Sequence, residues 1–141
     1  MKHKKALNVS RKTADRILSE VVQRAKEINA APYPKYMHFV KKIAVFGSYL
    51  TDKEKLGDVD IAVLLDARSE DGRKDRMDDA YECVRIHKKN LGFFETVSFS
   101  ETIVFQTLRN RSKALSLHYY YDLENMIEKW GTNHKVIYEK P

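Results

Sequence analysis

Two short apolar runs in the first half of the chain are each bounded by glycine or charged residues. The first run, 43–46, stops at Gly47-Ser48, and the second run, 61–65, follows Asp58-Val59-Asp60 directly. Both runs are rich in β-branched or aromatic residues, which is typical of β-strands. The pattern therefore predicts two strands connected by a polar segment.

The second predicted strand has two chemically different faces. Because side chains alternate along a strand, Asp58, Asp60 and Ala62 share one face. The residues between them are apolar and share the other face: Val59, Ile61, Val63 and Leu65. We therefore expect one face to pack on helices, while the other carries two carboxylates at its leading end.

Helical periodicity surrounds this pair of strands. Apolar residues recur at three- and four-residue steps from the N-cap candidate Ser10 to about Asn29, and the prolines at 32 and 34 end this helix. The segment 35–40 is expected to be a short turn or helical piece. After the second strand we expect a polar loop over 66–73 and a helix over 73–89, with acids early and bases late.

The last third of the chain alternates between the two patterns. It predicts a strand at 93–99, a helix at 101–111 capped by Ser100, a strand at 115–121, a helix at 122–130 and an extended tail at 135–139. The order of elements predicts an α/β or α+β fold, with a mixed sheet of four to five strands and helices packed on one face.

Composition changes this picture little. The chain has 141 residues, of which 43% are hydrophobic and 33% charged, and this fits one globular domain with a real core. We predict a single domain over 1–141 with a basic tail at 1–9. No apolar run approaches the ~20 residues of a membrane span. The single cysteine, Cys83, excludes an internal disulfide framework and favours a cytoplasmic location.

The paired aspartates and the Gly-Ser turn suggest a chemistry. Residues i and i+2 of a strand lie roughly 6.5–7 Å apart at the backbone, so their side chains can converge on one cation. Without a cation, two such carboxylates repel by about 2–3 kcal/mol at an effective dielectric near 20, and a divalent ion turns this repulsion into attraction. Oxygen ligands favour Mg²⁺ or Mn²⁺, and no Cys/His cluster suggests zinc. A glycine followed by a turn and a hydroxyl suits phosphate. Together they favour metal-assisted phosphoryl or nucleotidyl transfer; the alternative is a Gly-Ser turn and an Asp-rich loop before a buried strand.

Gly47-Ser48, nine residues, and then Asp58-x-Asp60 before an apolar strand resembles the signature of the DNA polymerase β-type nucleotidyltransferase superfamily, in its small minimal nucleotidyltransferase branch. The resemblance implies that an NMP, AMP first among them, moves from ATP or another NTP to a hydroxyl acceptor with Mg²⁺ or Mn²⁺. It implies that Gly47 and Ser48 hold phosphates and that Asp58 and Asp60 hold metal. It also implies that the protein is the antitoxin of a toxin–antitoxin pair with a helical, toxin-like partner.

The superfamily pattern ends with a third acid on the next strand, which by alignment to 93–97 is Glu95, as metal ligand and general base. Strict alternation places Glu95 on the same face as Phe93 and Val97, so this role needs a bulge or a one-residue offset. Glu101 is the fallback. The alternative for Glu95 is a salt-bridging residue at a strand edge.

Further candidates are weaker. Tyr49 either stacks on the nucleotide base or packs beneath the loop. Four basic residues are candidate triphosphate ligands or solvated surface charges: Lys53, Lys55, Arg68 and Arg73. His118 and Tyr120 share a face and either line a base pocket or are half-buried strand residues. The net charge of +6 favours polyanions such as NTPs or RNA, or reflects a basic tail. Two rival functions therefore stay open: an inactive nucleotide- or partner-binding module, and an RNA-binding accessory protein.

Overall fold

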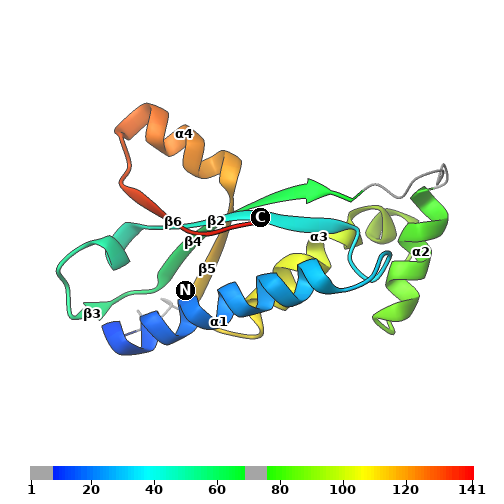
Figure 1. Ribbon diagram of the computed structural model, residues 1–141, viewed down its shortest axis with the longest axis horizontal. Coiled ribbons are helices and arrows are strands. Elements are labelled where there is room, and N and C mark those ends of the chain that lie inside the picture. The colour runs from blue at the N-terminus through cyan, green and yellow to red at the C-terminus, as the bar shows by residue number, and fades with distance from the viewer. Residues whose placement is uncertain (1–7, 69–75) are drawn as a thin grey trace, which may run out of the picture.

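A four-stranded mixed sheet organises the protein, as the computed structural model shows for residues 8–68 and 76–141 (Figure 1). Its strand order is β5-β4-β2-β6. The four strands are β2 (His38–Phe46), β4 (Val59–Ala67), β5 (Leu115–Tyr119) and β6 (His134–Glu139). β2 runs antiparallel to both β4 and β6, whereas β4 and β5 are parallel. The predicted mixed sheet of an α+β fold is confirmed.

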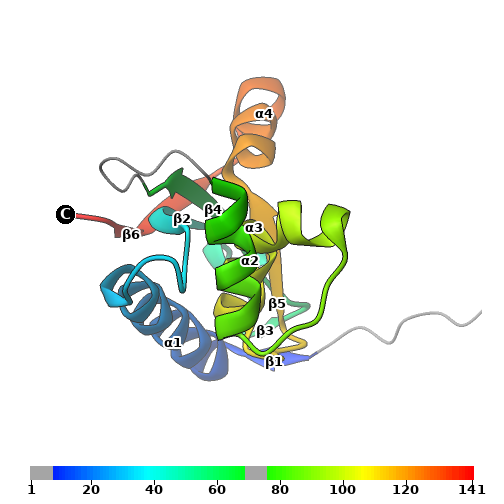
Figure 2. The same cartoon turned by 90° about the vertical axis from the view of Figure 1, so that its right-hand side faces the viewer.

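Helices lie on both sides of this sheet (Figure 2). α1 (Arg11–Ala30) and α3 (Phe93–Arg109) lie on the same side of the sheet and contribute buried residues to the main core. α2 (Arg76–Ile86) adds to that core beside α3. α4 (Tyr120–Trp130) lies on the opposite side, where Tyr120 and Leu123 join a second apolar cluster. The sequence predicted helices on one face of the sheet, and α4 is an additional helix that covers part of the other face.

The predicted alternation along β4 is confirmed. Val59, Ile61 and Val63 are buried in the main core, whereas Ala62 belongs to the cluster beneath α4. Each large apolar side chain that is fully buried contributes about 1.5–3 kcal/mol of transfer free energy. β4 is therefore held firmly from the apolar side, which fixes the direction of the aspartates on its other face.

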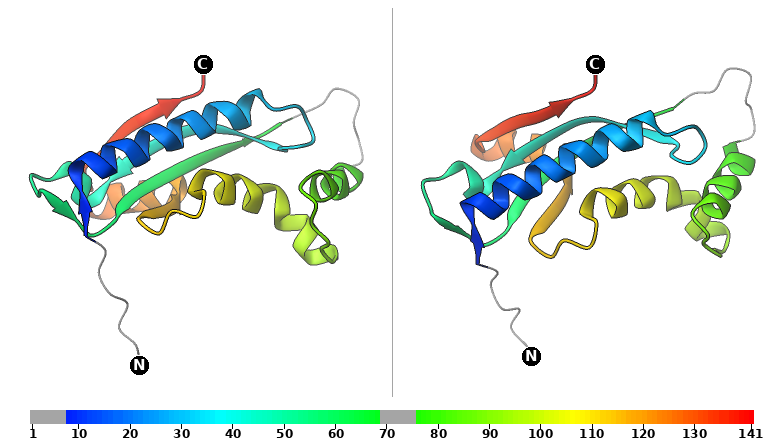
Figure 3. Two further views of the ribbon diagram at one scale, coloured as in Figure 1. Left: turned by 90° about the horizontal axis from the view of Figure 1, so that it is seen from below. Right: turned by 60° about the horizontal axis from the view of Figure 1, so that its bottom comes forward.

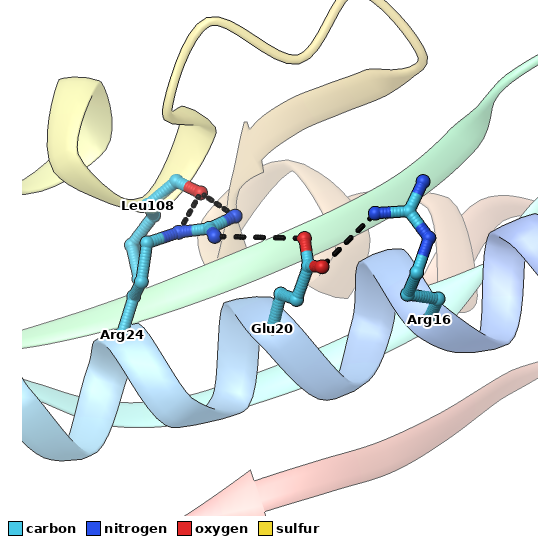
Figure 4. Close-up of polar contacts among 4 residues, drawn as sticks. All are labelled: Arg16, Glu20, Arg24 and Leu108. Atoms are coloured by element: carbon cyan, nitrogen blue, oxygen red, sulfur yellow. Dashed lines mark hydrogen bonds and ion pairs between the residues drawn. The ribbon is translucent and has the colours of Figure 1, made fainter.

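α1 is the predicted N-terminal helix and is tied to the end of α3. It begins after the N-cap Ser10, whose side chain accepts a hydrogen bond from the Thr13 backbone N–H. Farther along, the Arg24 guanidinium donates from Nε and Nη2 to the Leu108 carbonyl oxygen at 3.1 and 2.9 Å (Figure 4). A cation suits a carbonyl in the last turn of a helix, so this contact stabilises the packing of α1 on α3.

The largest departure from the sequence prediction lies at 93–109. The strand predicted at 93–99 and the helix predicted at 101–111 are one continuous helix, α3, and Ser100 lies inside it rather than at a cap. The buried residues of α3 recur at helical spacing: Thr96, Phe99, Ile103, Val104 and Leu108. The aromatic and β-branched residues of 93–99 favour a strand locally, but this stripe continues into the next segment and packs on the core as a helix.

Smaller corrections concern the ends of elements. The segment 38–40, predicted as a turn or helical piece, opens β2, and β4 continues to Ala67 into the predicted loop. The part of that loop after Arg68, with Gly72 and Arg73, lies outside the described residues. Tyr120 and Tyr121, predicted in a strand, begin α4. The predicted extended tail is β6, paired with β2.

The predicted basic tail at 1–9 is too long by at least one residue. Val9 lies in β1 (Val9–Ser10), where it pairs with Leu56 of β3 (Lys55–Leu56) and is buried. Within the described part of the chain, the longest apolar helices fall short of what a membrane crossing requires.

Candidate active site

The Gly-Ser turn and the aspartates meet at one end of the sheet because β2 and β4 are antiparallel neighbours. Phe46, the last residue of β2, is in register with Asp60 near the start of β4. Gly47 follows with a backbone φ of +77°, and a Cβ atom added there would lie 2.8 Å from Asp60 Oδ2. Only glycine combines this left-handed conformation with so close an approach to a carboxylate.

The turn continues as a short 3₁₀ helix, η1 (Gly47–Leu50). Hydrogen bonds of Ser48 connect this helix to Asp58 and to Thr51. The Ser48 hydroxyl lies 3.4 Å from the Asp58 carbonyl oxygen, to which it donates. The Ser48 carbonyl oxygen accepts from the Thr51 backbone N–H at 3.1 Å and from its hydroxyl at 2.6 Å. Ser48 is therefore held next to the backbone of the first aspartate.

Asp60 is a partly buried carboxyl group at this end of the sheet. Its side chain is 24% exposed, and its Oδ1 lies 3.3 Å from His118 Nε2. Burial raises the pKa of Asp60, the negative charge of Asp58 raises it further, and hydrogen bonds from His118 and Ser116 partly offset both effects. A divalent cation beside Asp60 would favour its ionised form and so offset the effects of burial and of the Asp58 charge.

The carboxylates remain available to such a cation. Asp58 is half-buried, and neither Asp58 nor Asp60 forms an ion pair with a lysine or arginine among residues 8–68 and 76–141. Two carboxylate groups beside a glycine turn suit one divalent ion. In the same described residues, no group of three His, Cys, Asp or Glu side chains is arranged to hold a metal by itself.

A family model described as a nucleotidyltransferase domain matches residues 19–117, which is more than half of the chain. The chain belongs to the nucleotidyltransferase domain family. The match includes Gly47, Ser48, Asp58 and Asp60 and ends within β5. It confirms the resemblance found in the sequence and supports nucleotidyl transfer as the class of activity. The search of curated proteins found no match, and neither did the search of solved structures.

In this nucleotidyltransferase domain Glu95 does not lie on a sheet strand. It is in the first turn of α3, exposed, and lines an open hollow of about 310 Å³ with Lys89, Ser98 and Gln106 among others. The predicted strand position of Glu95 is therefore wrong, and within residues 8–68 and 76–141 Glu95 belongs to no group of three His, Cys, Asp or Glu side chains that could hold a metal. The fallback, Glu101, also lies on α3. Burial raises the pKa of Tyr119, and the charge of Glu101 and a hydrogen bond to it raise that pKa further.

β5 pairs with β4 on the side away from β2, and it brings a serine and a histidine, rather than an acid, next to Asp60. The parallel register pairs Asp60 with Ser116 and Ala62 with His118. The Ser116 hydroxyl and His118 Nε2 are 3.2 Å apart, and the His118 ring also packs edge-on against Phe46. The nucleotidyltransferase domain thus presents a serine and a histidine to Asp60. The sequence marked His118 only as a candidate pocket residue, although alternation along 115–119 puts Ser116 and His118 on one face.

Tyr49 and the basic candidates have mostly structural contacts. The Tyr49 hydroxyl donates to Asp15 Oδ1 at 2.5 Å, so the ring packs against α1 beneath the loop. The buried Arg68 guanidinium donates to the Ile28 and Ala31 carbonyl oxygens, both at 2.6 Å, and thereby caps α1. Lys53 and Lys55 are exposed.

Proposed function

We propose that this protein transfers an NMP group, AMP in the first instance, from a nucleoside triphosphate to a hydroxyl acceptor in a metal-dependent reaction. The observation that carries the proposal is the close approach of Gly47 to Asp60 Oδ2, with Ser48 held against Asp58. This arrangement brings a phosphate-binding turn and a carboxylate pair to one place. Family membership supports the reaction class.

Each group has a proposed role. Gly47 and Ser48 bind the β- and γ-phosphates through backbone N–H groups and the hydroxyl. Asp58 and Asp60 hold Mg²⁺ or Mn²⁺, which, when bound, neutralises charge on the triphosphate. His118 keeps one oxygen of Asp60 in place by hydrogen bonding, and so leaves the other toward the turn. Tyr49 supports the nucleotide site from beneath the turn rather than stacking on a base.

In the proposed reaction the acceptor oxygen forms a bond to the α-phosphorus as the bond to the β-phosphate oxygen breaks in line. Pyrophosphate leaves and carries the negative charge that develops on that oxygen, while the acceptor hydroxyl transfers its proton to solvent water. The acceptors that we propose are a protein Tyr, Ser or Thr, an RNA end or a small hydroxylated molecule. As an antitoxin, the protein would modify a hydroxyl of a helical, toxin-like partner in the cytoplasm.

A second candidate function is nucleotide binding without turnover. It is favoured by the residues of β5 beside Asp60, which are Ser116 and His118 rather than a third carboxylate. Glu95, the residue expected to act as general base, lies on α3. On this view the aspartates bind one metal–nucleotide complex, and the complex itself regulates a partner protein.

One pair of assays separates these functions. The protein is incubated with Mg²⁺ and ATP labelled at the α-phosphate, in the presence of a purified RNA pool or a protein extract, and the binding of a non-hydrolysable ATP analogue is measured in parallel. We expect label transfer that Asp58→Ala abolishes and that ATP labelled at the γ-phosphate does not give. Asp66→Ala is the matched control, because Asp66 lies on the same strand but is exposed at its far end.

The outcomes have distinct meanings. Analogue binding that needs Asp58 and Asp60 but is accompanied by no label transfer establishes the second candidate. The absence of both transfer and analogue binding refutes both candidates. RNA binding that is salt-sensitive and survives Asp58→Ala instead favours the RNA-binding accessory protein.

A further inference from the structure

The loop between Gly47 and Asp58 is fastened to the start of α1 by one arginine. Arg11 Nη1 donates to the Tyr49 carbonyl oxygen at 2.8 Å, and Nη2 donates to the carbonyl oxygens of Thr51 and Lys53 at 2.7 and 2.8 Å. The Arg11 backbone N–H adds a bond to the Glu54 carbonyl oxygen at 3.2 Å. Three alternate carbonyl groups of the loop thus converge on a single side chain.

Two further contacts hold the same loop. The Arg11 guanidinium lies 5.2 Å from the centre of the Tyr49 ring, whose hydroxyl bonds to Asp15 one turn farther along α1. The loop then returns through β3, where Leu56 pairs with Val9 just before α1. Figure 3 shows the N-terminal end of α1 beside the loop that carries η1 and β3.

The middle of this loop is held by hydrogen bonds and not by a buried apolar side chain. All five residues from Thr51 to Lys55 are exposed, so apolar burial does not hold them. A guanidinium suits the task because it is always charged and presents its donors in a rigid planar fork. A lysine keeps the charge but donates from a single nitrogen, so it does not span three separated carbonyl groups.

We infer that Arg11 is a positioning residue for nucleotide binding, acting through the loop on the Gly47-Ser48 turn. This inference rests on the proposed function, because it assumes that the turn binds the triphosphate. When Arg11 is lost, the turn adopts its binding-competent arrangement for only part of the time. The apparent dissociation constant then rises in inverse proportion to that fraction, whereas the reaction of bound nucleotide is unchanged.

The test compares Arg11→Gln and Arg11→Lys with Arg16→Gln. Arg16 is on the same helix, but its ion pair is an exposed one with Glu20. We expect binding of the Mg²⁺ complex of a non-hydrolysable ATP analogue to weaken about tenfold in Arg11→Gln, if the competent arrangement is populated about one-tenth of the time. Arg11→Lys should not restore it, and Arg16→Gln should stay within about twofold of wild type. In any transfer assay the KM for the NTP should rise while kcat is retained.

Hydrogen exchange at the backbone amides of 49–54 gives a second readout that does not depend on nucleotide. It should accelerate in both Arg11 variants and not in Arg16→Gln. If Arg11→Gln does not fold, the inference is tested with Arg11→Lys and with Tyr49→Phe. Tyr49→Phe removes only the hydrogen bond to Asp15, so we expect a smaller loss of nucleotide binding. Wild-type binding in the folded Arg11 variants overturns the inference even if exchange accelerates. If the wild-type protein itself binds no nucleotide, the proposed function fails and the nucleotide role of Arg11 falls with it, while the exchange data still decide whether Arg11 holds the loop.

Discussion

Substituting Gly47 with alanine tests the contact on which the candidate site depends. The residue has φ +77°, a conformation that costs an L-residue with a side chain roughly 1–2 kcal/mol. The new Cβ would also meet Asp60 Oδ2 at 2.8 Å. Ordinary contact begins at 3.4 Å, so the carboxylate must move away by about 0.6 Å, and an off-rotamer side chain costs about 0.5–1.5 kcal/mol. We therefore expect Gly47→Ala to lower the free energy of unfolding by about 1.5–3.5 kcal/mol.

Two other glycines provide matched controls for urea denaturation. Gly131 has φ +62° and open space around it, so Gly131→Ala should show only the backbone cost, about 1–2 kcal/mol. Gly57 has neither a left-handed φ nor a neighbour within 4 Å, so Gly57→Ala should change stability by no more than about 0.5 kcal/mol. The difference between the Gly47 and Gly131 variants isolates the contact with Asp60.

Nucleotide binding gives the same comparison a functional readout. Gly47→Ala should weaken binding of the Mg²⁺–ATP analogue because it displaces Asp60, whereas Gly131→Ala, at the end of α4, should not. Equal stability of the Gly47 and Gly57 variants would refute the strain that we assign to this turn. Undiminished nucleotide binding by Gly47→Ala would show that the contact has no part in the site.

Three further predictions concern the core and the titrating groups. The folded-state pKa of Asp60 is raised, so the folded protein favours the protonated carboxyl group. The stability that this protonated group contributes is full below the unfolded pKa of about 4 and is lost as the pH rises through the folded pKa. Asp60→Asn should therefore be more stable than wild type at pH 7 without metal, with the difference vanishing below about pH 4; lower stability at pH 7 would contradict this. Burial raises the pKa of Cys83 to about 11, so alkylation at pH 8 should be slow in the native protein and fast in denaturant, and rapid native labelling would count against the buried site. Leu123→Ala, in the fully buried centre of the cluster beneath α4, should cost about 2–5 kcal/mol in urea denaturation, unlike a change at the exposed Glu124.

The sequence alone determined the central motif, because its signals are local. Alternation along 58–65 put the aspartates opposite an apolar face, and this follows from strand geometry wherever the strand lies. The closeness of Gly47 to Asp60 follows from the antiparallel pairing of β2 with β4 in that register. The spacing in the sequence predicted that Gly47 and Asp60 belong to one motif, but it did not predict which atoms of the two residues lie close together.

Tertiary structure decided which elements complete the site. The segment 93–99 has strand-like composition, and only its packing as part of a longer buried stripe made it helical, so Glu95 left the sheet. Parallel pairing then brought Ser116 and His118 to Asp60 from more than fifty residues away. The same long-range docking joined Arg11 to the carbonyl groups of 49–53. Such contacts depend on how separate elements pack, and a local pattern of polar and apolar residues does not encode them.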